Sequence, residues 1–190
     1  MKKNLFFVLV FCLISFLAKS QQVSVEKNTF GIQAGYFGIW GYQEVKLSNQ
    51  FTLRGELGLD GDFWKLDNSA ERGVLFSPEF SLEPRWYYNL NARHRKSKET
   101  AGNSGNFLTL KTRFRPDWFV VSNRNNLSVV SNLAILPTWG IRRNLGSHFN
   151  YEAGFGIGYA RYLDADHIDR FLQEKGEATI NIHLRIGYRF

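Results

Sequence analysis

Sulfur is scarce in this sequence, whose only cysteine is Cys12 and whose only methionine is Met1. Both fall within residues 1–20, which we predict to be removed from the mature chain. Residues 21–190 would then contain no thiol and could form no disulfide. This composition suits export through an oxidising compartment, although it does not require it.

The N-terminal segment has the pattern of a cleaved signal peptide. Lys2 and Lys3 precede an apolar run, and the run is followed by the small residues of Ala18-Lys19-Ser20. The run is shorter than the roughly 20 residues that a helix needs to span a bilayer. Cys12 lies inside the run rather than at its end, which argues against a lipoprotein cleavage site. We therefore predict a signal peptide over 1–20 and one mature domain over 21–190.

Long apolar runs and a large excess of one charge are also missing after residue 20. No later stretch is apolar enough to form a membrane helix. The segment 1–20 carries three lysines and no acid, so its removal lowers the formal net charge from +7 to +4. The basic residues are spread among acidic ones rather than gathered on one face. Nucleic-acid binding is therefore not expected.

The clearest pattern in the sequence is an alternation between Ala178 and Phe190. The apolar positions are Ala178, Ile180, Ile182, Leu184, Ile186, Tyr188 and Phe190. The intervening positions are polar, basic or small, and include His183 and Arg185. Because a strand repeats every two residues, it would have one apolar and one polar face. Alternating segments of about ten residues are typical of transmembrane β-barrels.

The same alternation recurs along the chain and predicts an all-β fold, an eight-stranded antiparallel transmembrane β-barrel. Residues 29–47 are divided into two short strands around Phe37–Gly38, because an even count places both termini on one side. The other predicted strands are 51–63, 76–90, 106–118, 127–143, 149–163 and 178–190. Their apolar faces, including Leu82 and Leu90 of 76–90, are expected to face lipid.

Aromatic residues make up 16% of the sequence, and the predicted strands place them in two belts around an aliphatic band. The inner, periplasmic belt would contain Trp86, Tyr88, Trp139, Tyr151 and Tyr188, and the outer belt Phe63, Trp64, Trp118 and Tyr159. Membrane barrels carry such girdles at both interfaces. The predicted location is therefore the cell outer membrane.

The inward faces predict a charged lumen. Eight strands enclose a space that side chains can fill, so we expect a closed network of ion pairs rather than an open pore. Its predicted members are Arg54, Glu56, Glu79, Glu83, Arg85, Lys111, Arg113, Arg115, Arg142, Glu152, His183 and Arg185. Gly154, Gly156 and Gly158 are expected to leave room for long arginine side chains.

Residues that could perform chemistry are few. The acidic segment Asp164–Asp169 fails as a calcium loop, since Asp169 stands where glycine is needed and Lys175 where the closing glutamate belongs. The predicted lipid face carries no serine–histidine pair at its outer rim. We therefore predict no catalytic residue, no metal site and no cofactor.

A basic turn, Asn91–Gly105, stands out among the predicted periplasmic turns. It carries Arg93, His94, Arg95, Lys96 and Lys98, and it is longer than the turns usual at that side of a barrel. It is either a solvated basic loop with a short helix or a site for an anionic partner.

The sequence resembles the small eight-stranded outer-membrane barrels of the OmpX and OmpA transmembrane-domain type. Its last residues, Ile186, Tyr188 and Phe190, resemble the C-terminal signal that the barrel-assembly machinery recognises. The segment Glu83–Asn89, the basic turn after it and Asn103-Ser104-Gly105-Asn106 are also similar to a group of uncharacterised small barrels. The resemblance implies a fold and a location but no activity. The lipid A-modifying barrels PagL and PagP share the size, but their catalytic residues find no matching positions here.

Three functions remain open at this stage. The first is a non-enzymatic, monomeric barrel that contacts outer-membrane lipid, lipopolysaccharide or another partner through its loops. The second is a lipid A-modifying enzyme of the same fold. The third is a secreted lipocalin-like barrel, prompted by the GxW match at Gly38-Ile39-Trp40. A lipocalin would turn its apolar face inward and its charges outward.

Overall fold

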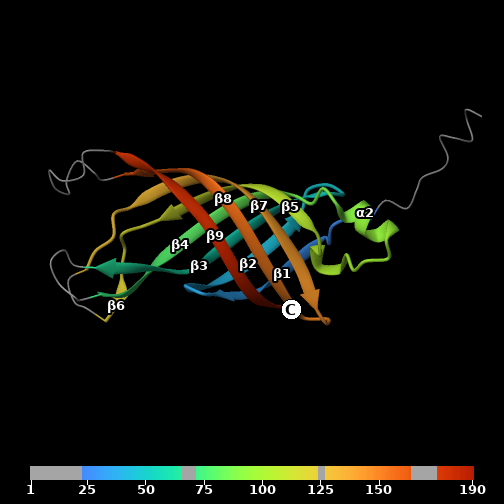
Figure 1. Cartoon of the computed structure of the whole chain (residues 1–190), viewed down its shortest axis with the longest axis horizontal. Coiled ribbons are helices and arrows are strands. Elements are labelled where there is room, and N and C mark those ends of the chain that lie inside the picture. Colours follow the sequence, from blue (N-terminus) through green and yellow to red (C-terminus); the bar gives the residue numbers. More distant parts are fainter. Residues whose placement is uncertain (1–22, 66–71, 124–126, 164–174) are drawn as a thin grey trace, which may run out of the picture.

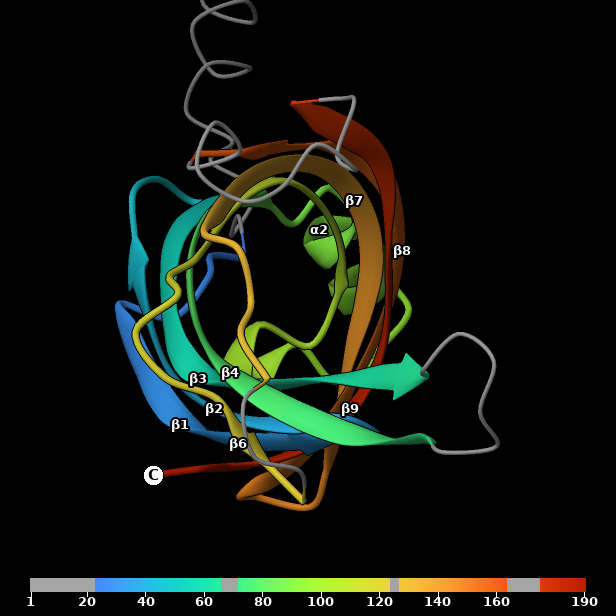
Figure 2. The ribbon, with the colours of Figure 1, turned by 90° about the vertical axis from the view of Figure 1, so that its left-hand side faces the viewer.

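The computed structural model describes residues 23–65, 72–123, 127–163 and 175–190. They form one antiparallel sheet that closes on itself, seen from the side in Figure 1 and end-on in Figure 2. The wall consists of β1 (Asn28–Gly35), β2 (Gly38–Lys46), β3 (Phe51–Lys65), β4 (Arg72–Trp86), β5 (Asn106–Arg115), β7 (Asn132–Leu145), β8 (Phe149–Tyr162) and β9 (Gly176–Arg189).

Each wall strand pairs with its neighbours along the chain, and β9 pairs with β1 to close the barrel. The short strand β6 (Val121–Ser122) pairs with β4 beyond the end of β5. The predicted eight-stranded antiparallel barrel is therefore confirmed. The division of 29–47 into two strands is also confirmed, because β1 ends at Gly35 and β2 begins at Gly38.

The two ends of the barrel differ. At one end the turns 47–50 and 146–148 are short, and the longer connection 87–105 contains α2 (Leu90–Arg95) and the 3₁₀ helix η1 (Ala101–Asn103). Figure 2 looks in from the other end, and α2 is visible across the far opening. We call these the capped end and the open end. Within the described residues, neither helix has the length and apolarity to cross a membrane.

An apolar cluster holds the cap against the barrel. Val25, Tyr87, Leu90 and Phe107 are its buried members. The segment before β1 is tied to the cap by two hydrogen bonds: Glu26 N donates to Asn103 Oδ1 at 2.8 Å, and Gly102 N donates to Glu26 Oε1 at 3.1 Å. Strand alternation predicted Leu90 on the outer face, and this was wrong. The chain leaves the sheet after Trp86, so Leu90 begins α2 and is fully buried.

Several strand boundaries also differ from the prediction; β4, for example, begins at Arg72 rather than at residue 76. Strand β5 ends at Arg115 rather than at residue 118, because Pro116 has no backbone N–H to continue the ladder. Strand β7 begins at Asn132, five residues later than predicted. The predicted signal peptide 1–20 lies outside the described residues.

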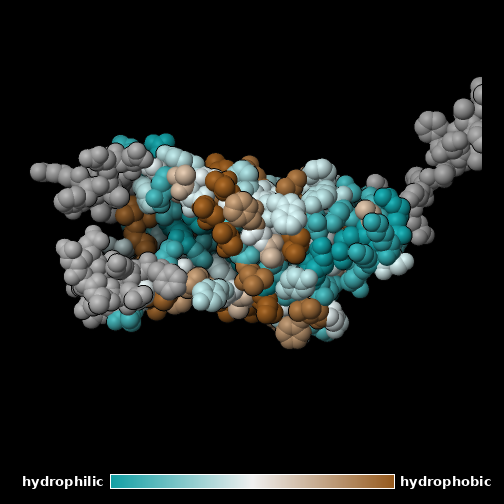
Figure 3. Space-filling view, viewed as in Figure 1, coloured by the Kyte–Doolittle hydropathy of each residue, from teal (hydrophilic) through white to brown (hydrophobic). Residues whose placement is uncertain are grey.

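Side chains divide cleanly between the two surfaces of the wall. Leu82 is 51% exposed and Phe155 is 50% exposed, whereas Glu83 is 2% exposed and Arg185 is 4% exposed. Figure 3 shows the result on one face, where an apolar band crosses the middle of the barrel and the capped end is hydrophilic. The functional candidates therefore lie inside the barrel and at its two ends.

Candidate functional site

Ten ionic side chains fill the middle and the capped half of the lumen. Five are cations and five are carboxylates, and none is more than 5% exposed. We call them the charge network: Arg54, Arg85, Lys111, Arg142, Arg185, Glu44, Glu56, Glu79, Glu83 and Glu152. The equal numbers make the network formally neutral, as burial of so many ions requires.

The strand register sets opposite charges beside each other. Arg54 of β3 pairs with Glu83 of β4, and Glu152 of β8 lies between Arg142 of β7 and Arg185 of β9. All of these positions share the inward parity of their strands. Of these register neighbours, Arg142 and Glu152 form an ion pair. Arg185 instead reaches Glu56 of β3 across the lumen.

Glu152 is the centre of the capped half. Arg85 binds it in a bidentate manner, with Nη1 donating to Oε2 at 3.0 Å and Nη2 to Oε1 at 2.9 Å. Arg142 Nη2 donates to Glu152 Oε2 at 2.8 Å. His183 Nε2 lies 3.5 Å from Oε1. Bidentate arginine–carboxylate pairs are among the strongest and most directional in proteins.

Glu56 has the same role nearer the open end. Arg54 Nε donates to its Oε1 at 2.6 Å, and Arg185 Nη1 to its Oε2 at 3.0 Å. Lys111 Nζ donates to Oε2 at 3.3 Å and also lies 3.3 Å from Glu79 Oε1. The lysine therefore joins two carboxylates at the boundary with the open half.

Sequence reasoning missed Glu44. Arg142 Nη1 and Asn103 Nδ2 donate to its carboxylate at 2.8 and 2.9 Å, and Thr52 Oγ1 does so at 2.7 Å. Glu44 shares its strand face with Trp40 and Tyr42, two aromatics that favour an outward assignment. Because Glu44 alternates with Tyr42 and Trp40 on the same face of β2, its charge indicates that this face points into the lumen.

Trp40 and Tyr42 stack on cations of the charge network. The Arg54 guanidinium lies 3.9 Å from the Tyr42 ring centre, and the Arg185 guanidinium 3.8 Å from that of Trp40. Arg85 stacks in the same way on Phe107, at 4.2 Å. Stacking on a ring face stabilises a desolvated guanidinium. Arg142 also lies over the Tyr42 ring, at 5.5 Å, so all four arginines of the network have both a carboxylate and a ring.

Arg115 and Arg113 lie at the open end beyond the network, and His183 lies between them and Glu152. Arg115 forms an ion pair with Asp60, and its Nη1 donates to Asp62 Oδ2 at 2.6 Å. Arg113, in contrast, has no carboxylate within 4.0 Å and donates no side-chain hydrogen bond in the described part of the chain. The side chain of His183 is 10% exposed.

The glycines of β8 do not serve the predicted purpose. A Cβ at Gly154 would lie 2.8 Å from Nε2 of His183, and one at Gly158 would meet the backbone of Ile135. A Cβ at Gly156 would collide with Thr138. The glycines therefore make room for a histidine ring, a threonine and the neighbouring strand, not for arginine side chains.

One serine–histidine contact occurs outside the predicted positions. Ser147 Oγ and His148 Nδ1 are 2.8 Å apart on the exposed turn between β7 and β8. The His148 ring stacks on Tyr188, with ring centres 5.5 Å apart. In the described residues no carboxylate orients this histidine, so the pair lacks the third group of a catalytic triad. The acidic segment Asp164–Asp169 lies outside the described residues.

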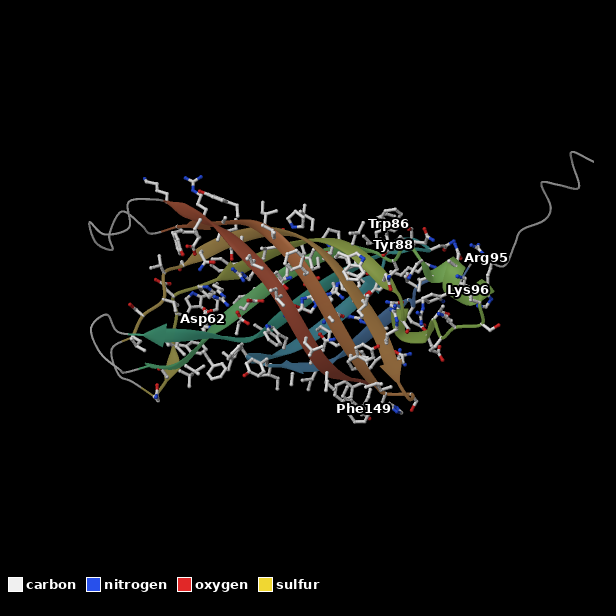
Figure 4. The ribbon with its side chains drawn as sticks, in the orientation of Figure 1. Asp62, Trp86, Tyr88, Arg95, Lys96 and Phe149 are labelled. Atoms are coloured by element: carbon white, nitrogen blue, oxygen red, sulfur yellow. The ribbon has the colours of Figure 1, made fainter. Side chains whose placement is uncertain are left out.

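The basic turn forms the outer surface of the cap, as Figure 4 shows for Arg95 and Lys96. Arg93 is held within the turn, where its Nη2 donates to the Glu99 carbonyl at 2.8 Å. His94, Arg95, Lys96 and Lys98 are exposed. Beneath them, burial raises the pKa of the Tyr87 phenol well above its ordinary value. The predicted short helix is α2.

The three residues of the predicted assembly signal lie on the outer surface beside the barrel closure. Ile186 and Tyr188 pair with Ala34 and Ile32 of β1. The ring of Phe190 stacks on Phe30 with their centres 5.5 Å apart. They are 59%, 39% and 62% exposed, respectively.

Comparison with known proteins identifies no relative: no family model matches the sequence, no curated protein is significantly similar to it, and no solved structure matches the barrel significantly. The resemblance to small outer-membrane barrels thus stays a prediction from the sequence. What is established is a closed, eight-stranded antiparallel barrel with a buried network of salt bridges inside.

Proposed function

We propose that this chain is an integral outer-membrane β-barrel, monomeric and without enzymatic activity, that acts in envelope structure or through partners bound at its ends. The main support is its inverted distribution of side chains. Leu110, Ile157 and Ile182 on the outer wall are 47%, 56% and 74% exposed, while the interior is ionic. A bilayer is the solvent that suits such a surface.

The size of the apolar band supports a lipid environment. Exposure of apolar surface to water costs roughly 25 cal/mol per Å². Monomeric soluble proteins rarely expose contiguous patches larger than a few hundred Å². Here the apolar band crosses the face seen in Figure 3, and exposed aliphatic residues occur on β3, β4, β5, β7, β8 and β9.

Aromatic side chains lie at both margins of this band. Trp86, Trp139 and Tyr188 are 39–45% exposed toward the capped end, and Figure 4 shows Trp86 and Tyr88 beside the cap. Trp118 and Tyr159, 66% and 57% exposed, lie toward the open end. This arrangement is typical of the interfacial girdles of membrane barrels.

A lipocalin-like barrel is not favoured. Its lumen would have to be apolar, yet Trp40 of the GxW match stacks on Arg185 among buried carboxylates. The filled network also favours a sealed lumen over a conducting channel, because no ion could pass without breaking buried pairs.

In this proposal the capped end lies in the periplasm, and the open end meets lipopolysaccharide and the cell exterior. The short turns at the capped end are the support for this orientation. Arg95, Lys96 and Lys98 would then contact an anionic partner in the periplasm. Ile186, Tyr188 and Phe190 would be recognised by the barrel-assembly machinery during insertion.

Cell fractionation with electrophoresis of heated and unheated samples tests the location. We expect the protein in the outer-membrane fraction and a shift in mobility on boiling. Recovery as a monodisperse protein in buffer without detergent would overturn the proposal.

A pair of lysine substitutions tests which surface meets hydrocarbon. Ile182→Lys places a cation in the middle of the band and should lower the free energy of unfolding in bilayers by about 2–4 kcal/mol. The matched Leu47→Lys, at an exposed residue in a turn, should cost at most about 1 kcal/mol. In a soluble barrel the two variants would be equally harmless.

A further inference from the structure

The open half of the lumen contains a cavity of about 540 Å³ above the charge network. Figure 3 shows it as a hydrophilic hollow beside β9. The charged residues of its lining are Asp60, Asp62, Glu79, Lys111, Arg113, Arg115, Glu177 and Arg185. Its volume is within the range of small-molecule sites in proteins.

The small residues Ser77 and Ala160 line the cavity, and small inward residues also flank Arg113 in the strand register. Arg113 of β5 lies between Ser81 of β4 and Ala134 of β7 in the strand register, and Ala160 of β8 follows Ala134. None of these side chains can reach across the lumen. The space that a second long residue would occupy is left to a ligand or solvent.

Several donors on the wall have no acceptor. Trp40 Nε1, Arg113 Nε and Arg185 Nε are buried atoms with no hydrogen-bond partner among the described residues. Trp40 and Arg185 are each 4% exposed. An indole and a guanidinium can only donate hydrogen bonds. Because these three nitrogens have almost no accessible surface, a ligand in the cavity would be bound by the terminal nitrogens of Arg113, which can only donate and therefore require acceptor oxygens.

The acids of the lining already have partners. Asp60 and Asp62 pair with Arg115, and Glu79 lies 3.3 Å from Lys111 Nζ. Glu177 accepts a hydrogen bond of 2.5 Å from the Tyr162 hydroxyl. Arg113 is thus the cation of this cavity that has no carboxylate within 4.0 Å in the described chain, and its charge acts on Asp62 only at longer range.

The cavity also opens sideways. Strand β9 pairs with β1 only through Arg185–Arg189, so residues 176–184 have no partner strand on that side in the described chain. The β1–β2 hairpin is shorter than the β3–β4 and β8–β9 hairpins on either side of it. The barrel wall therefore extends less far toward the open end at this position. Ile180, Ile182 and Leu184 border the cavity and are 59–74% exposed.

The geometry points to a binding site for the oxyanion group of a small ligand, a carboxylate or phosphate bound by Arg113 and reached from the open end or across β9. A guanidinium binds either group through two parallel hydrogen bonds. The exposed aliphatic residues beside the lateral opening suit a ligand that carries a short apolar tail. This site is a property of the barrel and does not depend on the membrane assignment.

Titration of the folded full-length mature protein in zwitterionic detergent tests the site, with hexanoate, acetate and neutral hexanol as probes. The indole N–H resonance of Trp40 is the readout, because the Trp40 ring lines the cavity. The indoles of Trp86 and Trp139 lie on the outer surface and report nonspecific effects, including partition of the probe into detergent. We expect hexanoate to shift the Trp40 signal saturably and hexanol to leave it unchanged.

The acetate arm separates the two sources of the oxyanion. Acetate binding as tight as hexanoate binding would identify a small free anion, and binding at least tenfold weaker would identify the head group of an amphiphile. Either result supports the oxyanion site. Saturable hexanol binding as tight as that of hexanoate would overturn it.

Three variants complete the test. Arg113→Met should weaken hexanoate binding at least tenfold, and Ala160→Leu, which fills the cavity without changing a charge, should do the same. Arg161→Met, at an exposed position on β8, is the matched control and should bind as the parent does. Absence of saturable binding, or equal binding by the parent and both cavity variants, would overturn the proposal.

Discussion

The two halves of the lumen share one barrel wall but differ in how completely their inward charged side chains are paired. In the capped half, each arginine faces carboxylates, and Arg54 and Arg85 also stack on aromatic rings. In the open half, Arg113 faces Ser81 and Ala134, and a cavity remains. The number of strands sets the size of the lumen, but the size and charge of a few inward residues decide whether it is filled.

This difference has an electrostatic reason. An ion removed from water loses several kcal/mol of solvation, which only close partners and hydrogen bonds recover. Deep in the capped half no water can replace a missing partner, so the charges there have to balance. The open half reaches solvent, and an unpaired Arg113 is tolerated there.

Glu152→Gln should have the largest effect on the capped half. The substitution keeps the shape but leaves Arg85 and Arg142 without their shared carboxylate, and we expect the free energy of unfolding to fall by about 3–5 kcal/mol. Equilibrium urea unfolding of the refolded barrel measures it. Asp62→Asn is the control at the open end, where the Asp62 side chain is 51% exposed, and should cost less than about 1 kcal/mol. Equal losses would mean that the halves do not differ as described.

Enlarging a side chain should destabilise the capped half more than the open half. The difference in the free energy of unfolding should be smaller than that expected for Glu152→Gln. A Cβ at Gly140 would lie 2.8 Å from Cε2 of the Phe107 ring, on which Arg85 stacks. Gly140→Ala should therefore destabilise the barrel by about 1–3 kcal/mol through overpacking. Ala160→Leu extends into the cavity and should change stability by less than about 1 kcal/mol. The same urea titration applies, and a larger loss for Ala160→Leu would argue against an open half with free space.

Tyr87→Phe should give the smallest effect and the opposite sign. The Tyr87 hydroxyl is buried without a hydrogen-bond partner in the described chain, so its removal should stabilise the protein at neutral pH by about 1 kcal/mol. In contrast, Tyr88→Phe removes a hydroxyl that accepts a hydrogen bond from Trp139 Nε1 at 2.9 Å. That control should be neutral or destabilising.

The pH dependence of the same variant provides a second readout. Burial raises the pKa of Tyr87 in the folded state, so above a pH of about 10 the unfolded state releases a phenolic proton that the folded state retains. Unfolding free energy of the parent should therefore fall as the pH rises above about 10. Tyr87→Phe should reduce this slope, and an unchanged slope would contradict the burial of the phenol.

The sequence allowed the strands and their inward faces to be predicted because alternation is a local property. The eight strands and the antiparallel closure follow from it, and so does the inward position of Arg54, Glu152 and Arg185. Alternation fails where the chain leaves the sheet. Leu90 is the example, because the apolar alternation of β4 continues in the sequence after Trp86 although the strand has ended. Alternation also misleads where aromatics face inward, as Trp40 and Tyr42 do beside Glu44.

The cavity could not be predicted in the same way. Arg113 has the same parity as Lys111 and Arg115, and nothing local marks it as the one of the three that has no carboxylate partner among the described residues. That depends on Ser81 and Ala134, which are distant in sequence and opposite in register. Pairing across a barrel is a tertiary property that a single sequence does not encode in its local pattern.

The closure between β1 and β9 has a consequence for how the barrel would come apart. Its ladder covers only Gly31–Gly35 against Arg185–Arg189, whereas β3 and β4 pair from Phe51–Trp86 to Lys65–Arg72. Fewer backbone hydrogen bonds hold this seam, and the stacked rings of Phe30 and Phe190 reinforce it only near the cap. Under mechanical or chemical stress, unzipping should begin at the rim beside Gly35 and travel toward the terminal aromatic ring.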